Sequence, residues 1–100
     1  MSARDLPSFE TINAAARARL PDLLARWLPG GRRLGREYVA RNPKRTDRHP
    51  GSFKVNLHSG RWADFATGEQ GGDPVSLAAY LFELTQGEAA RRLADMLGVR

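Results

Sequence analysis

The first thirty residues carry apolar side chains at the spacing of an amphipathic helix. The apolar positions are Ile12, Ala15, Ala16, Leu20, Leu23, Leu24, Trp27 and Leu28. Pro21 interrupts the pattern, and because proline has no N–H and clashes with the preceding turn, it predicts a break between two helices. We expect Pro21 in the first turn of the second helix and Ser8 as the N-cap of the first. The pattern therefore predicts a helical N-terminal segment over residues 1–30.

Residues 52–58 alternate between polar and apolar side chains, as a half-buried strand does. Phe53 and Val55 point to one face of this predicted strand, and the polar residues between them point to the other. Ser59-Gly60 is typical of a tight two-residue turn. After this turn, residues 61–66 are expected to return as the partner strand of a hairpin.

A two-residue turn sets Leu57 opposite Trp62 and Val55 opposite Asp64. Asp64 then falls on the apolar face, where a carboxylate is costly unless it is hydrogen-bonded. A further short strand is expected before this hairpin. The middle of the chain therefore predicts a small three-stranded antiparallel sheet over residues 35–66.

The last quarter of the chain carries two signals that start helices. Asp73 is a good N-cap, and Pro74 is a good first residue for a helix that is apolar on nearly all sides. Thr85 and Glu88 have the spacing of a capping box, which starts a final helix. We therefore expect a helical pair over residues 73–97 and an α+β fold for the whole chain.

The composition limits the class of protein. The chain has 100 residues, the size of one domain, and 41% of them are hydrophobic. It has no cysteine, which excludes disulfides and thiolate chemistry. No apolar run approaches the roughly 20 residues of a membrane span, and the N-terminus shows no apolar signal segment. We expect a single cytoplasmic domain, residues 1–100, that has no membrane partner.

The formal net charge is +5, and the positive charge is concentrated in the middle of the chain. Between Gly30 and Arg61 there are nine lysines and arginines against two acids, Glu37 and Asp47. A basic segment between two nearly neutral ones favours a polyanionic partner, such as a nucleic acid.

Other chemistries find little support in the sequence. The turn at residues 68–73 is rich in glycine but lacks the lysine and Ser/Thr of a nucleotide-binding P-loop. The histidines His49 and His58 do not stand at a familiar metal-ligand spacing from each other or from any acid. Nothing marks a nucleophile or a pair of catalytic carboxylates. The sequence therefore predicts no catalytic residue, no cofactor and no metal site.

Nucleic-acid binding needs only cations for the phosphates and flat side chains on which bases stack. The basic loop over residues 44–49 directly precedes the predicted sheet. The polar sheet face then displays Lys54, His58 and Arg61 with Phe65 beside them. The alternative is an ordinary solvated strand face with Phe65 packed under a helix, and the residues alone leave both interpretations open.

The order of motifs along the chain is similar to that of one known family. The motifs are Gly35-Arg36, then residues 49–55 (HPGSFKV), residues 61–65 (RWADF), Gly71-Gly72-Asp73 with the apolar helix that follows, and the closing EAARRLADMLGV. In this order they resemble the CHC-type zinc-binding domain at the N-terminus of bacterial, phage and plasmid DNA primases. The resemblance covers about two-thirds of the chain and implies a zinc-ribbon-like sheet.

The zinc ligands of that family have no counterpart here. Phe65 and Gly68 stand where the family has its second cysteine pair, and the first ligand pair is also missing. The resemblance therefore implies a cysteine-free, metal-less variant. A structural zinc supplies roughly 10 kcal/mol of folding free energy in small fingers, so its loss must be offset by packing. The side chains expected to do so are Tyr38, Phe53, Trp62 and Phe65, with the N-terminal helices.

The resemblance also implies a function. In the family this domain engages the single-stranded template for a separate catalytic domain, so this chain is expected to be a non-catalytic, single-stranded-DNA-binding module of plasmid- or phage-type replication. Its expected partners are single-stranded DNA and a primase or helicase catalytic domain, or another replication protein. The expected DNA-contacting residues are Arg36, Arg41, Lys44, Arg45, Arg48, His49, Lys54, His58, Arg61, Trp62 and Phe65.

A second function also fits the sequence. The exposed side of the N-terminal helices, around Trp27 and Leu28, could dock on a replication or mobile-element protein, which would make the chain a protein–protein adaptor. An apolar interface of this kind responds weakly to salt, whereas DNA binding responds strongly.

Overall fold

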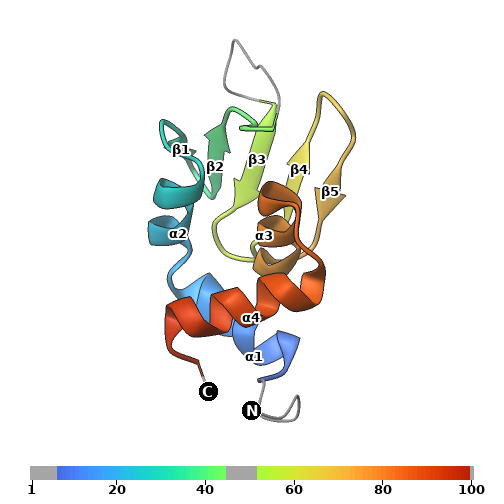
Figure 1. Ribbon diagram of the computed structural model, residues 1–100. Helices are drawn as coiled ribbons and strands as arrows, with labels where there is room; N and C mark the ends of the chain where they lie inside the picture. The colour runs from blue at the N-terminus through green and yellow to red at the C-terminus, as the bar shows by residue number, and fades with distance from the viewer. Residues whose placement is uncertain (1–6, 45–51, 100) are drawn as a thin grey trace.

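The computed structural model describes residues 7–44 and 52–99. Within these ranges the chain forms four helices and one five-stranded sheet, so the predicted α+β class is confirmed, whereas the predicted number of three strands is wrong. The elements in order are α1 (Phe9–Ala18), α2 (Leu20–Trp27), β1 (Arg32–Leu34), β2 (Glu37–Ala40), β3 (Phe53–Asn56), β4 (Trp62–Asp64), β5 (Gln70–Gly71), α3 (Pro74–Phe82) and α4 (Gln86–Leu97) (Figure 1).

The N-terminal helices form as the sequence predicts. The Ser8 side chain accepts a hydrogen bond from the Thr11 backbone N–H and caps α1. Arg19 separates the two helices, and Pro21 lies in the first turn of α2. Backbone N–H groups in the first turn have no partner within the helix, so the proline costs no helical hydrogen bond there. The proline therefore determines where one helix ends and the next begins.

The C-terminal helices also begin at their predicted caps. Asp73 and Ser76 form a capping box at α3, and Thr85 and Glu88 form another at α4. Gly98 ends α4 in the left-handed conformation, as a C-terminal glycine commonly does. Local side-chain chemistry therefore sets both boundaries of α4.

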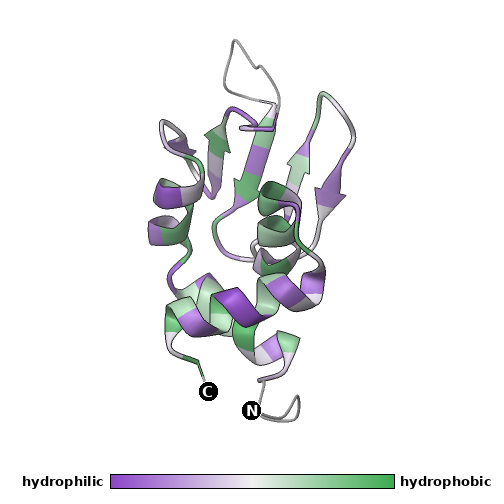
Figure 2. Cartoon of the chain, viewed as in Figure 1, coloured by the Kyte–Doolittle hydropathy of each residue, from purple (hydrophilic) through white to green (hydrophobic). Residues whose placement is uncertain are grey.

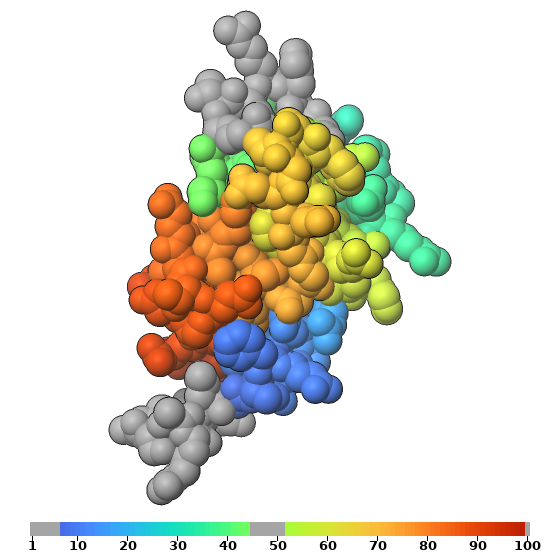
Figure 3. All heavy atoms as spheres, turned by 90° about the vertical axis from the view of Figure 1, so that its right-hand side faces the viewer, coloured from blue at the N-terminus to red at the C-terminus, as the bar shows by residue number. Residues whose placement is uncertain are grey.

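The sheet is an antiparallel meander in which each strand pairs with its neighbour in sequence. Helices cover one of its faces, and none of the described helices lies on the other, which we call the open face (Figure 1). In Figure 3, which looks at the molecule from the β5 side, α3 and α4 lie on one side of the yellow β4–β5 segment, and the residues around β1 lie on the other. The helices and the sheet thus form two layers.

The hairpin of β3 and β4 has a longer loop than the sequence predicts. Val55 lies opposite Trp62, and Phe53 lies opposite Asp64, so the predicted register is wrong by two residues. Asn56 and Arg61 close a four-residue loop, in which the Asn56 side chain accepts hydrogen bonds from two loop N–H groups. A shift of two residues preserves the side-chain alternation, so each side chain still points to its predicted face.

The two edge strands were outside the predicted sheet. β1 is a run of two arginines and a leucine, with every residue exposed, and β5 has only two residues. Neither carries an alternating pattern, because neither buries a side chain. The sheet therefore extends over residues 32–71 and exceeds the predicted limits of 35–66 at both ends.

The buried side chains form two adjoining clusters. One joins α1, α3 and α4 around Ile12 and Leu93, and the other joins α2, the sheet and α3 around Phe53 and Leu77. Figure 2 shows the consequence: α3 is apolar along most of its length, and the colours of β3 alternate. Helix α3 belongs to both clusters, so it is the element that joins the sheet to the helical layer.

Candidate nucleic-acid interface

The open face of the sheet presents one exposed aromatic ring. Phe65 directly follows β4, and its backbone N–H continues the ladder by donating to the Ser52 carbonyl at 2.8 Å. Because Asp64 points into the core, Phe65 points outward, and its side chain is 69% exposed. The Lys54 ammonium lies 5.5 Å from the centre of the ring, within the range of a cation–π contact. Phe65 is therefore not packed under a helix.

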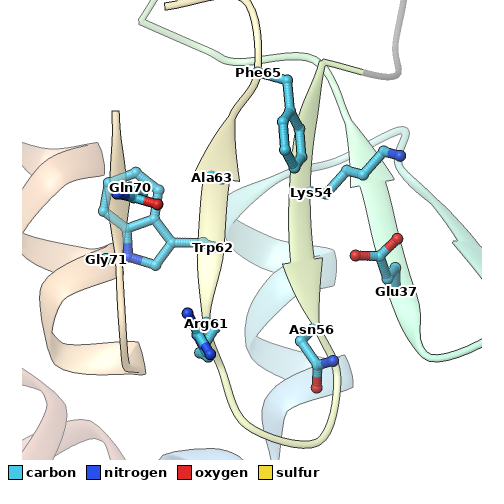
Figure 4. A pocket seen from close by; sticks show the side chains of 9 residues that line it. All are labelled: Glu37, Lys54, Asn56, Arg61, Trp62, Ala63, Phe65, Gln70 and Gly71. Atoms are coloured by element: carbon cyan, nitrogen blue, oxygen red, sulfur yellow. The ribbon is translucent and has the colours of Figure 1, made fainter. Parts of the chain in front are cut away.

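Polar side chains surround this ring. Lys54 pairs with Ala63 across β3 and β4, and Ala63 pairs with Gln70 on β5, so these three residues form a row on the open face. A shallow hollow runs beside them, with Arg61 and Asn56 at its other end (Figure 4). The lining of the hollow includes two cations, two side-chain amides and the exposed Phe65 ring, which are groups that bind phosphates and bases, together with the Glu37 carboxylate.

Two of the expected contact residues lie at the end of the sheet. Arg36 is in the turn between β1 and β2, and His58 is in the loop between β3 and β4. The Leu57 backbone N–H donates to the Arg36 carbonyl at 2.7 Å, which holds the turn against the loop. Arg33 joins Arg36, Leu57 and His58 in lining a second hollow there. Arg33 was not predicted as a site residue, because β1 was not recognised as a strand.

The remaining expected contact residues are dispersed. Arg41 follows β2 and is exposed. The Lys44 ammonium donates to the Tyr80 carbonyl at 2.9 Å and lies 4.3 Å above the Tyr80 ring, so it is engaged with α3 and separate from Phe65. Three further residues lie outside the described part of the chain: Arg45, Arg48 and His49.

Trp62 does not offer its ring to a base, contrary to the sequence-based expectation. It is only 6% exposed. Its ring stacks on Tyr80 at 4.7 Å between centroids and on Phe53 at 5.8 Å, and its Nε1–H donates to Ser76 Oγ at 3.0 Å. Both ring partners belong to the core layer between the sheet and α3. Trp62 and Phe53 are thus core residues, whereas Phe65 is not.

A buried polar network lies at the same end of the sheet as Phe65. The Asp64 carboxylate is fully buried and accepts hydrogen bonds from Asn42 Nδ2 and from the Ala66 backbone N–H, both at 2.8 Å. Asn42 Nδ2 also lies 2.8 Å from the Tyr80 hydroxyl, which donates to Glu69 at 3.1 Å. Burial raises the pKa of Tyr80, with the neighbouring carboxylates contributing, so the phenol stays protonated as a donor. The requirement that Asp64 be hydrogen-bonded on the apolar face is therefore met.

The adaptor surface expected around Leu28 needs correction. Leu28 is only 2% exposed, because it packs into the core beneath the sheet. The exposed apolar side chains near Trp27 come instead from α3 and α4: Phe82 is 50% exposed and Met96 is 47% exposed. The Phe82 and Trp27 rings meet edge-on at 5.8 Å and help to line an apolar hollow on the helical side of the molecule.

Neither the described residues nor the comparisons with known proteins assign this chain a function. Over residues 7–44 and 52–99, no group of three or more histidines and acids is placed to hold a metal ion. None of the helices within the same ranges is both long and apolar enough to cross a membrane. No protein-family model matches the chain, and no curated protein matches it at a significant level.

Proposed function

We propose that this chain is a non-catalytic module that binds single-stranded DNA on the open face of its sheet. The observation that carries the proposal is the position of Phe65, which is exposed on that face with Lys54 beside it. Exposure of a large aromatic ring to water is unfavourable, and a ligand that covers the ring removes this free-energy cost. An exposed ring on a cationic face therefore favours a ligand that has flat, apolar surfaces and negative charge.

Single-stranded DNA fits this face better than a duplex does. Stacking on Phe65 requires an unpaired base whose flat surface is free, and a base inside a duplex is already stacked on its neighbours. Phosphates on either side of that base would meet Lys54 and Arg61, and a longer strand would reach Arg36 and His58 at the end of the sheet. The proposed interface therefore uses six of the expected contact residues when the exposed Arg41 is included.

The resemblance to the primase zinc-binding domain supports the same proposal. It supplies the biological setting: template engagement for a separate catalytic domain, in plasmid- or phage-type replication in the cytoplasm. In this proposal the stack of Phe53, Trp62 and Tyr80, with the hydrogen bonds of Asp64, does the structural work that zinc does in that family. The open face is then left to bind DNA.

The proposal is tested by fluorescence anisotropy with labelled single-stranded and double-stranded oligonucleotides over a series of salt concentrations. We expect the single strand to bind more tightly and the logarithm of its association constant to fall with log[salt], with a slope of about −0.7 per phosphate contacted. Charge reversal at Lys54 and Arg61 should weaken binding and reduce the slope. Equal affinity before and after that double change would remove the open face as the interface.

A protein–protein adaptor is the second candidate, and the exposure of Phe82 and Met96 is the observation in its favour. Binding through that apolar hollow would change little with salt, because desolvated apolar contacts are not screened. A Phe82→Ala variant separates the two functions. DNA binding through the open face should be unaffected by this substitution, whereas an adaptor interface should lose affinity.

A further inference from the structure

Glu37 is an acid on a face that otherwise carries cations and amides. It is the first residue of β2, and it lies opposite Asn56 in the pairing of β2 with β3. Its half-buried side chain lines the same hollow as Phe65, and no other carboxylate lines that hollow among the described residues. Figure 4 shows the Glu37 carboxylate and the Phe65 ring on the same side of the sheet, with Lys54 between them.

A carboxylate in this position opposes the binding of phosphates. It repels the sugar–phosphate backbone, and as an ionised group it can only accept hydrogen bonds. A ligand that places a hydrogen-bond donor against Glu37 turns this repulsion into a favourable contact. In DNA the donors are on the bases, because the phosphates and the deoxyribose ring of an internal nucleotide offer only acceptors.

The location of Glu37 suits an interaction with the edge of a stacked base. Val39 lies opposite Lys54, so Glu37 is two residues along β2 from the row of the sheet that holds Lys54. The Phe65 backbone lies beyond that row, opposite Ser52, but its ring points back toward Lys54, 5.5 Å from the ammonium (Figure 4). Two residues of a strand span about 6.6 Å. A base that stacks on Phe65 and extends toward β2 therefore brings its hydrogen-bonding edge close to the carboxylate. Asn56, on the adjacent strand, is a second polar group at the same level.

We propose that Glu37 selects the base that stacks on Phe65, by accepting a hydrogen bond from an exocyclic amino group. Cytosine, adenine and guanine carry such a group. Thymine does not, and its one donor, the ring N3–H, lies between two carbonyl oxygens that the carboxylate repels. This inference rests on the proposed binding of single-stranded DNA to the open face and adds a base preference to it. The preferred ligand is a strand with an amino-bearing base at the stacking position.

The comparison of oligo(dC) with oligo(dT) tests this inference, because both are pyrimidine strands of the same size. Anisotropy would be measured at one salt concentration for the wild type, for Glu37→Gln and for Glu10→Gln. The last variant is the matched control, because Glu10 is an exposed acid on α1 and its loss changes the net charge by the same amount. We expect the wild type to bind oligo(dC) roughly tenfold more tightly than oligo(dT), within the range for one base contact.

The Glu37→Gln variant should bind oligo(dT) more tightly than the wild type does, because a repulsive charge is gone, and the preference for oligo(dC) should shrink to about twofold or less. Glu10→Gln should keep the wild-type ratio. If the wild type binds both strands equally, or if Glu37→Gln retains the wild-type ratio, base selection by Glu37 is wrong although DNA binding stands. If the wild type binds neither strand, the proposed function itself is wrong, and this inference is overturned with it.

Discussion

The Asn42 side chain donates a 2.8 Å hydrogen bond to the Asp64 carboxylate, and both side chains are buried, at 1% and 0% exposure. Asn42 follows β2, and Asp64 ends β4, so this bond joins two strands that are not neighbours in the sheet. Asn42 Nδ2 also lies 2.8 Å from the Tyr80 hydroxyl of α3. One amide therefore ties together the end of the sheet and the helix that covers it.

Replacement of Asn42 by alanine should lower the free energy of unfolding by about 2–3 kcal/mol, because it removes a donor from a buried carboxylate. Urea denaturation of the variant and the wild type measures the difference. Gln86→Ala, at an exposed position in the first turn of α4, serves as the control and should change stability by less than about 0.5 kcal/mol. A loss at Asn42 as small as that of the control would show that the bond does not hold this end of the sheet.

Trp62 and Phe65 should respond in opposite ways to truncation. Trp62→Ala removes a buried ring together with its stacking contacts, and it should lower the free energy of unfolding by about 3–5 kcal/mol. Phe65→Ala removes a ring that is 69% exposed and should change stability by about 0.5 kcal/mol or less. Chemical denaturation monitored by far-UV circular dichroism reports both values. Similar losses for the two variants would contradict the assignment of one ring to the core and the other to the open face.

Two glycines with a positive φ angle offer a matched pair. Gly60 has φ +80°, and a Cβ there would lie 2.6 Å from the Pro74 ring, whereas Gly68 has φ +86° and open space around its Cα. Alanine at either position incurs about 1–2 kcal/mol of left-handed strain. Gly60→Ala should lower the free energy of unfolding clearly more than Gly68→Ala does, because the new Cβ meets the rigid Pro74 ring at the start of α3. Thermal unfolding compares the two variants, and equal shifts in Tm would show that the loop does not press on α3.

The capping box at α4 should make stability depend on pH in the acid range. The hydrogen bonds from the Thr85 backbone and side chain hold the pKa of Glu88 below its ordinary value. The ionised form is thus favoured in the folded state, so its contribution is present above the unfolded-state pKa and is lost as the pH falls through the folded-state pKa. The Tm difference between the wild type and Glu88→Gln should therefore be present at neutral pH and disappear in acid. A difference that is constant with pH would rule out this role for Glu88.

Local signals in the sequence predicted the helices well, because each boundary depends on side chains close to it. Ser8, Pro21, Asp73 and Thr85 each act on the backbone of the same or the next turn, and all four occupy their expected positions. Strand pairing depends on distant residues instead. The loop from Leu57 to Gly60 was therefore predicted too short, and the edge strands, which bury no side chain of their own, were not recognised.

The candidate site could be predicted only in part, for the same reason. Alternation along β3 and β4 correctly separates Lys54 on the open face from Trp62 in the core. No local pattern shows that the Lys44 ammonium contacts Tyr80, 36 residues away in the chain. The contribution of Arg33 and Gln70 depends on edge strands that only the assembled sheet creates.

The most direct test of the central claim is the affinity of a short single-stranded oligonucleotide for Phe65→Ala, measured by fluorescence anisotropy beside the wild type and Phe82→Ala. Phe82 is the matched control, because it is an exposed phenylalanine on the helical side of the molecule. Loss of one stacked base should cost about 1–3 kcal/mol, which raises Kd by about 5- to 150-fold. We expect that increase for Phe65→Ala and a wild-type Kd for Phe82→Ala. An unchanged Kd for Phe65→Ala would show that single-stranded DNA does not bind on the open face through Phe65.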